Sequence, residues 1–367
     1  MTTPYRADQV GSLLRPPELL AARAEHAGGR LPREELRAIE DRAILDALER
    51  QRQIGIGVRT DGELRRDDFM GDMVEAVEGF APAPAGPGGL EWRGEGAAGN
   101  WQGVIVAGKL RQTRRLTAEE SAFLRAHAPG PFKITLPSPT QFGHSRFRPG
   151  ITDPFYATPE DLLRDVVGIV RGEVASLVQE GVSYVQLDAP SYTGYLDPRR
   201  VERMRQGGLD TARALEEMIA ADNACLAGVP REGATLAIHL CRGNNRSSWL
   251  SEGGYDPIAE RVFGALDYDV FLLEYDSERA GGFEPLRFVP RGKTVVLGLV
   301  TTKTGALEPQ DDLLRRIEEA SKYVPIENLA LSPQCGFASN SLGNLLSIDD
   351  QWRKLELVVD TARKVWG

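Results

Sequence analysis

The sequence contains few cysteines and histidines and has no cluster of basic residues. Its 367 residues include only three cysteines and four histidines, and no block of lysine or arginine stands out against a formal net charge of −9. A small, odd number of cysteines excludes a disulfide framework and favours a reducing compartment. The missing basic block excludes the electrostatic footprint of a nucleic-acid-binding protein.

Long apolar runs and a targeting signal are also missing. No run approaches the ~18 apolar residues of a membrane-spanning helix. The N-terminal residues MTTPYRADQVGSLLRPP lack the basic and then apolar pattern of a signal peptide. We therefore expect a cytoplasmic protein with no membrane partner. Its composition, 41% apolar and 26% charged residues, is ordinary for a globular protein.

What the sequence does contain is a regular alternation of strand-like and helix-like segments. Short apolar runs lie at residues 8–14, 56–63, 131–137, 182–190, 234–241, 268–276, 293–300 and 328–336. Apolar residues recur every three or four positions in the intervening segments 32–53, 158–181, 209–228, 308–324 and 347–366. The alternation predicts an α/β fold, namely a (β/α)8 TIM barrel formed by residues 1–367 as one domain.

One segment interrupts this alternation. Residues 79–113 are rich in Gly, Pro and Ala and then become strand-like. We interpret the segment as an insertion, a loop with a hairpin, over the mouth of the barrel. A doubly wound sheet is the alternative fold, but no glycine-rich phosphate-binding motif follows any predicted strand.

Polar side chains follow the predicted strands at the ends where a TIM barrel carries its chemistry. They are carboxylates, thiols, one imidazole and one hydroxyl, and two of the three cysteines are among them. The set consists of Ser12, Asp61, Glu63, Asp188, His239, Cys241, Glu274, Asp276 and Cys335. We expect these side chains to converge on one rim of the barrel.

Zinc prefers sulfur, imidazole nitrogen and carboxylate oxygen as ligands, and this set offers all three. His239 and Cys241 are two residues apart on one predicted strand, so both can face the barrel axis. Glu274 and Cys335, from later strands, could complete a thiolate-rich site that suits zinc better than magnesium or calcium. A core histidine beside a packed thiol is the alternative, and Cys225, on a predicted helix, is interpreted as core.

Taken together, the motifs resemble the cobalamin-independent methionine synthase family. HLCRGN, LLEYDS and LSPQCGF give the order His-x-Cys, Glu, Cys of that family, and RADQVGSLLRP, TDGELRRDDF, KITLPSPTQF and VQLDAPSY resemble other landmarks of its short members. The resemblance covers residues 5–366 and corresponds to the catalytic C-terminal half of the long enzymes. It implies a barrel that holds zinc through His239, Cys241, Glu274 and Cys335, where the zinc binds the acceptor thiol as a thiolate.

The resemblance also implies a substrate and the residues that bind it. The implied reaction is methyl transfer to the thiol of homocysteine, which gives methionine. Asp188 and Glu63 match family carboxylates around the amino group of homocysteine, and Ser12 matches a position that holds its carboxylate. For Ser12, a turn residue beside Gly11 is the alternative interpretation.

The sequence departs from the family pattern on the side of the methyl donor. After the seventh strand, where the long enzymes have a histidine that protonates the folate leaving group, this chain has Thr301, Thr302 and Lys303. A folate-cradling tryptophan is not evident in LPSPTQFGHSRF. We therefore expect a donor other than a folate polyglutamate, such as a methyl-cobalamin protein, a small methylated compound or an epoxide.

Other functions stay open at this stage. Epoxyalkane:coenzyme M transferases share the fold and the zinc motif, but their sulfonated thiol has no amino group, and Glu63 and Asp188 would repel a sulfonate. Lys303 and Arg242 partly offset that repulsion. A non-catalytic barrel with a structural zinc is a second alternative, and a metal-free isomerase that uses the two acids is a third. A homodimer is compatible with such a barrel.

Overall fold

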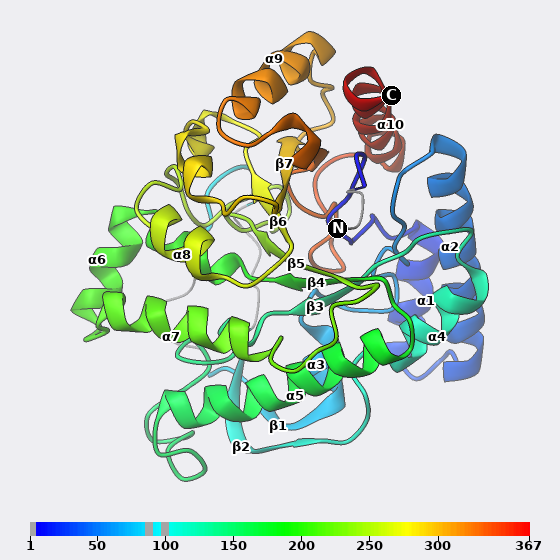
Figure 1. Ribbon diagram of the computed structural model, residues 1–367. Coiled ribbons are helices and arrows are strands. Elements are labelled where there is room, and N and C mark those ends of the chain that lie inside the picture. The colour runs from blue at the N-terminus through cyan, green and yellow to red at the C-terminus, as the bar shows by residue number, and fades with distance from the viewer. Residues whose placement is uncertain (1–4, 85–90, 97–102) are drawn as a thin grey trace.

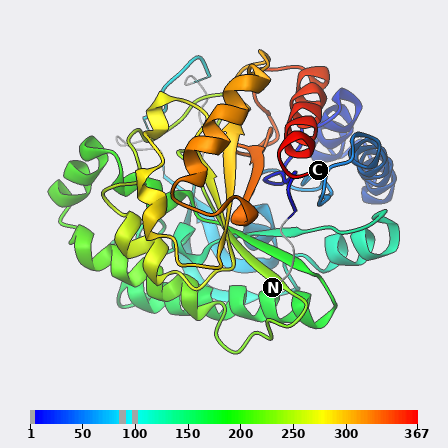
Figure 2. The same cartoon turned by 45° about the horizontal axis from the view of Figure 1, so that its top comes forward.

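The computed structural model describes residues 5–84, 91–96 and 103–367. At its centre lies a six-stranded parallel sheet in the order β3-β4-β5-β6-β7-β8. The strands are β3 Ile134–Pro137, β4 Tyr184–Asp188, β5 Thr235–Leu240, β6 Val270–Glu274, β7 Thr294–Val300 and β8 Leu329–Pro333. Figure 1 shows them surrounded by helices, and Figure 2 shows the same arrangement from a second direction. Six of the predicted strands are thereby confirmed, each shorter than predicted.

Two further segments close the sheet into a barrel. Ala7 forms a parallel bridge with Leu331 in β8, and Arg59 forms one with Phe132, just before β3. The two segments also meet each other, because the Gly57 N–H donates to the Ala7 carbonyl at 2.9 Å. With these bridges the barrel has eight strand positions, which confirms the predicted (β/α)8 fold.

The predicted strands at 8–14 and 56–63 are nevertheless wrong as regular strands. Side chains occupy some of the backbone groups that a ladder would use, as where Gln186 Nε2 donates to the Val10 carbonyl at 2.8 Å. The Val10 carbonyl thus bonds to a side chain rather than to a neighbouring strand, and the ladder is interrupted there. The second segment also turns before its predicted end, since Glu63 has a φ of 54°.

Helices cover the outside of the barrel. The five predicted helices are present as α2 Arg33–Ile54, α5 Pro159–Gln179, α7 Thr211–Ala224, α9 Gln310–Ser321 and α10 Ile348–Trp366. They are joined by α1 Pro17–Ala27, α3 Gly71–Ala76, α4 Ala118–His127, α6 Pro198–Gln206 and α8 Ala259–Ala265. Thr158 and Ser347 cap α5 and α10 through their side chains. Within the described residues, no helix is both long and apolar enough to cross a membrane.

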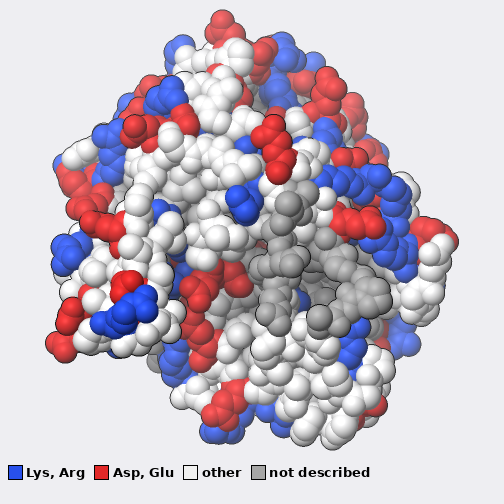
Figure 3. All heavy atoms as spheres, turned by 180° about the vertical axis from the view of Figure 1, so that it is seen from behind, with Lys and Arg blue, Asp and Glu red and all other residues white. Residues whose placement is uncertain are grey.

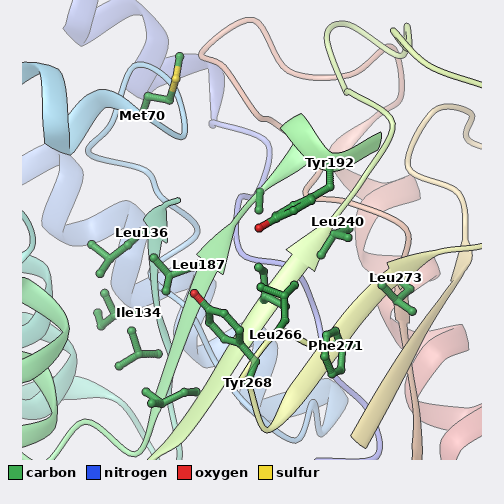
Figure 4. Close-up of a cluster of buried hydrophobic side chains, with 14 of the residues drawn as sticks. Met70, Ile134, Leu136, Leu187, Tyr192, Leu240, Leu266, Tyr268, Phe271 and Leu273 are labelled. Atoms are coloured by element: carbon green, nitrogen blue, oxygen red, sulfur yellow. The ribbon is translucent and has the colours of Figure 1, made fainter. Parts of the chain in front are cut away.

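The barrel has an inner and an outer apolar core because successive strand residues point to opposite faces. The inner core consists of Val10, Val58, Tyr184, Ala237, Val270, Leu272, Val296 and Ala330. Outward-facing residues of the same strands, such as Leu187 and Leu273, pack under the helices in the larger core shown in Figure 4. Because Ala237 and Leu272 face inward, His239 and Glu274, two positions later, face the interior at its C-terminal end.

The predicted insertion contains an antiparallel hairpin of β1 Val77–Pro82 and β2 Val104–Gln112. The hairpin packs on the loop after β3, where the Phe80 and Phe142 rings lie 5.6 Å apart and the Val106 N–H donates to the Arg146 carbonyl. That loop leaves the C-terminal end of β3, so the hairpin borders the mouth of the barrel. Residues 85–90 and 97–102 of the insertion lie outside the described residues.

Charged side chains of both signs are interspersed over the face of the molecule seen in Figure 3. Some pair across neighbouring helices, as Arg50 of α2 does with Glu356 of α10 at 3.0 Å. Exposed pairs of this kind contribute little to stability.

Candidate active site

A cavity lies at the C-terminal ends of the barrel strands. It measures about 870 Å³, including the solvent space at its mouth. The residues predicted as site residues that line it are Ser12, Glu63, Asp188, His239, Cys241 and Cys335. Glu274 is not part of the lining. A cavity of this size, with several convergent polar groups, is typical of a small-molecule site.

Three predicted metal ligands meet in this cavity: His239, Cys241 and Cys335, which we call the buried trio. One ligand atom from each lies within 4.8 Å of the others, and all three side chains are buried. Neither ring nitrogen of His239 has a hydrogen-bond partner within the described part of the chain. Burying an imidazole with unmet nitrogens costs free energy, which a metal ion bound to one of them would recover. Two thiols and an imidazole therefore fit a zinc ion by their chemistry.

The members of the buried trio shift one another's pKa. Contact with the Cys241 thiol, together with the nearby His239 ring, holds the pKa of Cys335 well below its ordinary value despite burial. The same contact, added to burial, raises the pKa of Cys241 well above its ordinary value. Cys335 raises the pKa of His239 against the opposing effect of burial, although their geometry is not that of a hydrogen bond. The group thus favours a thiolate at Cys335, which is the form in which cysteine binds a metal.

Glu274, the predicted fourth ligand, ends β6 outside this close group. Its Oε2 accepts a hydrogen bond from the Arg242 backbone N–H at 2.6 Å, and its Oε1 accepts one from Arg279 at 2.9 Å. Burial works to raise the pKa of Glu274, but the charges of Lys303, Arg242 and Arg279 outweigh it and lower the pKa. The carboxylate is therefore ionised and oriented. Each oxygen keeps a second lone pair, so the role of Glu274 as a ligand stays a prediction.

Two other predicted carboxylates line the cavity. Asp188 ends β4, and burial raises its pKa to about 7. Glu63 accepts a hydrogen bond from Thr135 Oγ1 at 2.8 Å, and burial raises its pKa against the nearby charge of Arg66. The left-handed backbone of Glu63 is held by a bond from its N–H to Asp61 Oδ1 at 2.9 Å. Buried acids with raised pKa values and locally strained backbone are frequent at functional sites.

Ser12 packs against the loop that carries Cys335. Its Oγ accepts a hydrogen bond from the Ala338 N–H at 3.3 Å, and its carbonyl accepts one from the Phe337 N–H at 2.9 Å. A side chain at Gly336 would collide with Ser12 Oγ, so the close approach of the two segments requires glycine. Ser12 is thus both a structural turn residue and a cavity residue, and its hydroxyl can still donate its own hydrogen.

Several cavity residues were not expected from the sequence. Trp92 comes from the insertion, and a Cβ at Gly243 would lie 3.2 Å from its ring. A bridge between Arg93 and Trp249 fastens this part of the insertion to the loop after β5. The others include Asp68, Met70, Gln141, Arg146, Asn244, Asn245 and Asn340. The only signal for Trp92 in the sequence is that it is one of two tryptophans in this Gly- and Pro-rich segment.

The two cations considered for sulfonate binding are both engaged within the protein. Lys303 Nζ donates to the Gly243 carbonyl at 3.2 Å and to Asn244 Oδ1 at 3.3 Å. Arg242 is fully buried, and its guanidinium donates to the Gly253 carbonyl at 2.7 Å. Neither residue lines the cavity, so neither offsets the negative charge of its acids from within.

The fold and the cavity together define a class of protein. A (β/α)8 barrel with buried acids at the C-terminal ends of its strands, beside a thiol–imidazole group that could hold a metal ion, is typical of an enzyme. The chain belongs to the family described as cobalamin-independent synthase, catalytic domain, whose model matches residues 6–363. The resemblance seen in the sequence is thereby confirmed, and this family is one of methyltransferases.

Individual proteins are similar to this chain in sequence or in structure. The chain is 39% identical to the uncharacterized protein YxjG of Bacillus subtilis, over 99% of this chain and 95% of that protein. A putative vitamin-B12 independent methionine synthase from Listeria monocytogenes has a similar structure, with a TM-score of 0.75 and 31% identity over 100% of this chain and 99% of that one. The B12-independent methionine synthase from Shewanella sp. W3-18-1, in complex with selenomethionine, shares the fold, with a TM-score of 0.72 and 20% identity over 98% and 97%.

Proposed function

We propose that this protein transfers a methyl group to the thiol of homocysteine in a zinc-dependent reaction that gives methionine. The observation that carries the proposal is the buried trio, in which the imidazole nitrogens lack partners, within one cavity that also holds Ser12, Glu63 and Asp188. Membership in the synthase family supports thiol methyl transfer as the reaction type.

The buried trio would hold the zinc ion, with Glu274 as the fourth ligand. When bound, zinc supplies the positive charge that keeps a substrate thiol in its nucleophilic thiolate form at neutral pH. Glu274 remains hydrogen-bonded to the Arg242 N–H and to Arg279 whether or not it binds the metal. It is therefore the ligand that a substrate sulfur would replace at the smallest cost.

Other residues of the cavity would bind and orient the amino acid. Asp188 and Glu63 would accept hydrogen bonds from the ammonium group, and Ser12 would donate one to the carboxylate. Charge-assisted hydrogen bonds in a buried cavity are stronger than those at the surface. A sulfonated thiol such as coenzyme M would instead place an anion against the two acids, so the lining favours an amino-acid thiol.

We infer that the methyl donor is not a folate polyglutamate. Where a histidine would protonate a folate leaving group, Lys303 has its amino group bonded to Gly243 and Asn244. Trp92 supplies an aromatic wall from the insertion rather than from the loop after β3. A small methylated compound, or a cobalamin-bound methyl group carried by a partner protein, is the donor class to test.

The proposal is tested by measuring zinc content, zinc-edge X-ray absorption with and without homocysteine, and methionine formation. We expect a single zinc ion per chain, whose shell gains a sulfur and loses a lighter atom when homocysteine is added. Methylcobalamin or a small methylated compound should support methionine formation better than methyltetrahydrofolate polyglutamate. A zinc shell that does not respond to homocysteine would contradict the proposal.

A further inference from the structure

A chain of buried polar side chains runs along the barrel axis and ends at Asp188. Lys133 Nζ, inside the barrel, donates to Asp8 Oδ1 at 2.8 Å, to Gln186 Oε1 at 2.7 Å and to the Gln9 carbonyl. Gln186 Nε2 in turn donates to Asp188 Oδ1 at 2.8 Å. Lys133 and Gln186 are at most 1% exposed, and neither lines the cavity. The reaction proposed above makes no use of either residue.

The direction of every hydrogen bond in this chain is fixed by Lys133. A lysine ammonium has three hydrogens and no acceptor, and its three partners here are all acceptors. The carbonyl end of the Gln186 amide must therefore face Lys133. Its NH2 end must then face Asp188, where it donates to Oδ1, and the Val10 carbonyl, to which it also donates. An amide flip would place two donors together at Lys133 and two acceptors together at Asp188.

The fixed orientation of the Gln186 amide in turn orients the carboxylate of Asp188. One oxygen, Oδ1, is held by Gln186, whereas Oδ2 accepts no hydrogen bond from the residues that the structure describes. Asp188 lines the cavity beside the buried trio. The carboxylate is thus fixed in rotation and retains acceptor capacity for a ligand. A group held in this way loses less conformational freedom on binding than one that rotates freely.

We propose that Gln186 and Lys133 are positioning residues that make the site selective for thiols with an α-ammonium group. The inference rests on the proposed function, because it assigns the cavity to an amino-acid thiol. Homocysteine should bind better than 4-mercaptobutanoate, the same thiol acid without the amino group. 4-Mercaptobutanoate would leave the buried carboxylate of Asp188 without the ammonium group as a partner. Its affinity should therefore be lower than that of homocysteine by a factor on the order of 10 to 100.

The inference is tested with two variants whose effects on folding differ. Gln186→Glu keeps the contact with Lys133 and, when ionised beside that ammonium, has no hydrogen to donate to Asp188 and places a second carboxylate beside it. The double variant Gln186→Met/Lys133→Met removes the acceptor and its donor together with little change of volume, which limits the number of unpaired buried groups. Asp8 keeps its bonds from the Tyr184 hydroxyl and the Gln9 N–H.

Gln51→Met is the matched control. Gln51 is also fully buried and bonded at both ends of its amide, with Gln9 donating to its Oε1 and its Nε2 donating to the Ala47 and Thr60 carbonyls. It makes no contact with Asp188. Its replacement should lower the free energy of unfolding without changing the selectivity between the two thiols.

The measurement is the dissociation constant of each thiol for the zinc-loaded proteins, by calorimetry. We expect the preference for homocysteine to fall about tenfold or more in both Gln186 variants and to be unchanged in Gln51→Met. Weaker homocysteine binding should account for the loss, with 4-mercaptobutanoate nearly unaffected. An unchanged preference in a folded, zinc-loaded Gln186→Glu protein would overturn the inference.

The same experiment distinguishes a failure of the proposed function from a failure of the selectivity inference. If the wild type prefers homocysteine and the Gln186 variants lose this preference, but no donor yields methionine, the reaction is wrong and the selectivity inference stands. If the zinc-loaded wild type binds both thiols equally, the selectivity inference is overturned while thiol activation survives. If it binds neither thiol, both are overturned.

Discussion

Two groups of side chains in this protein bring metal-ligating atoms together, and they differ in what surrounds them. His144, Glu160 and Glu217, which we call the surface trio, satisfy the same 4.8 Å limit as the buried trio. Arg213 pairs with both acids of the surface trio, at 3.1 Å from Glu160 and 2.6 Å from Glu217, and His144 contacts Glu217 at 3.3 Å. The surface trio is therefore already partly neutralised and hydrogen-bonded.

The buried trio has no such partners. Both ring nitrogens of His239 are without a hydrogen bond in the described structure, and the Cys335 sulfur has a long contact, at 3.8 Å, with the neutral Ser339 hydroxyl. The comparison shows that closeness of ligand atoms does not by itself define a metal site. What distinguishes the buried trio is unmet bonding capacity in a place from which water is largely excluded.

Removing the thiols of the buried trio should have the largest effect. Cys241→Ala or Cys335→Ala is expected to lose zinc and to lower the rate of methionine formation by more than about 100-fold, because even indirect partners of metal ligands cost 10–100-fold. Zinc is measured by mass spectrometry on the purified proteins. Stoichiometric zinc in the double variant Cys241→Ala/Cys335→Ala would contradict the assignment.

Cys225→Ala is the control for this comparison. Cys225 is also buried, but it follows the end of α7, and its sulfur lies 3.9 Å from the Val167 carbonyl, away from the cavity. Its replacement should leave zinc content and activity unchanged and lower the free energy of unfolding by about 1 kcal/mol. Loss of zinc in this variant would show that cysteine removal acts through the fold.

Some parts of the barrel could be predicted from the sequence and others could not. β3 to β8 were predictable because strands buried on both faces consist of continuous apolar residues. The first two strand positions were predicted too, but their irregular form was not, because it depends on side chains such as Gln186, which lies far away in sequence. The convergence of His239, Cys241 and Cys335 followed from strand periodicity and from the rule that strand ends meet at one rim.

The remaining features of the site depend on loops. The bonding of Glu274 by Arg279 and the Arg242 N–H is set by two loops whose shapes have no period in the sequence. The presence of Trp92 in the cavity depends on the bridge between Arg93 and Trp249. Contacts of this type join residues that are distant in the chain, so no local sequence pattern predicts them.

Glu274→Gln should have the next largest effect. If Glu274 is the fourth ligand, zinc affinity falls by about 10–100-fold, measured by competition with a chelator. Asp276→Asn is the control, because Asp276 also bonds to Arg279, at 3.1 Å, and is not a predicted ligand. Equal zinc affinity in the two variants would remove Glu274 from the ligand set and leave the buried trio as the whole protein contribution.

Asp222 is a third case, in which a buried group has its hydrogen-bonding capacity filled. It is fully buried, but Ser138 Oγ and the Tyr192 hydroxyl donate to its two oxygens at 2.7 and 2.8 Å. Burial raises the pKa of Asp222 to about 7. The folded protein therefore retains a proton that the unfolded chain releases above its ordinary value of 3.8. The contribution of Asp222 to stability is present at low pH and is lost as the pH rises through about 7.

Asp222→Asn should remove this dependence. Relative to the variant, the free energy of unfolding of the wild type should fall by at most about 1.4 kcal/mol per pH unit between about pH 4 and pH 7. Urea unfolding of both proteins at several pH values measures the difference. Zinc content should not change. Parallel pH profiles for the two proteins would show that Asp222 ionises normally and that its burial has no such cost.

The smallest effect is expected in the surface trio, and it gives the sharpest test of the comparison. His144→Ala should leave zinc content unchanged, activity within about twofold and the free energy of unfolding within about 0.5 kcal/mol. Arg213→Met removes the cation that pairs with Glu160 and Glu217, so this variant should acquire weak zinc binding that the wild type lacks. Calorimetry at excess zinc would detect it, and His144→Ala added to Arg213→Met should abolish it. The comparison would be contradicted if the wild type bound a second zinc ion that is lost in His144→Ala. In that case the ion pairs of Arg213 do not prevent zinc binding, and closeness of the ligand atoms is enough for a metal site.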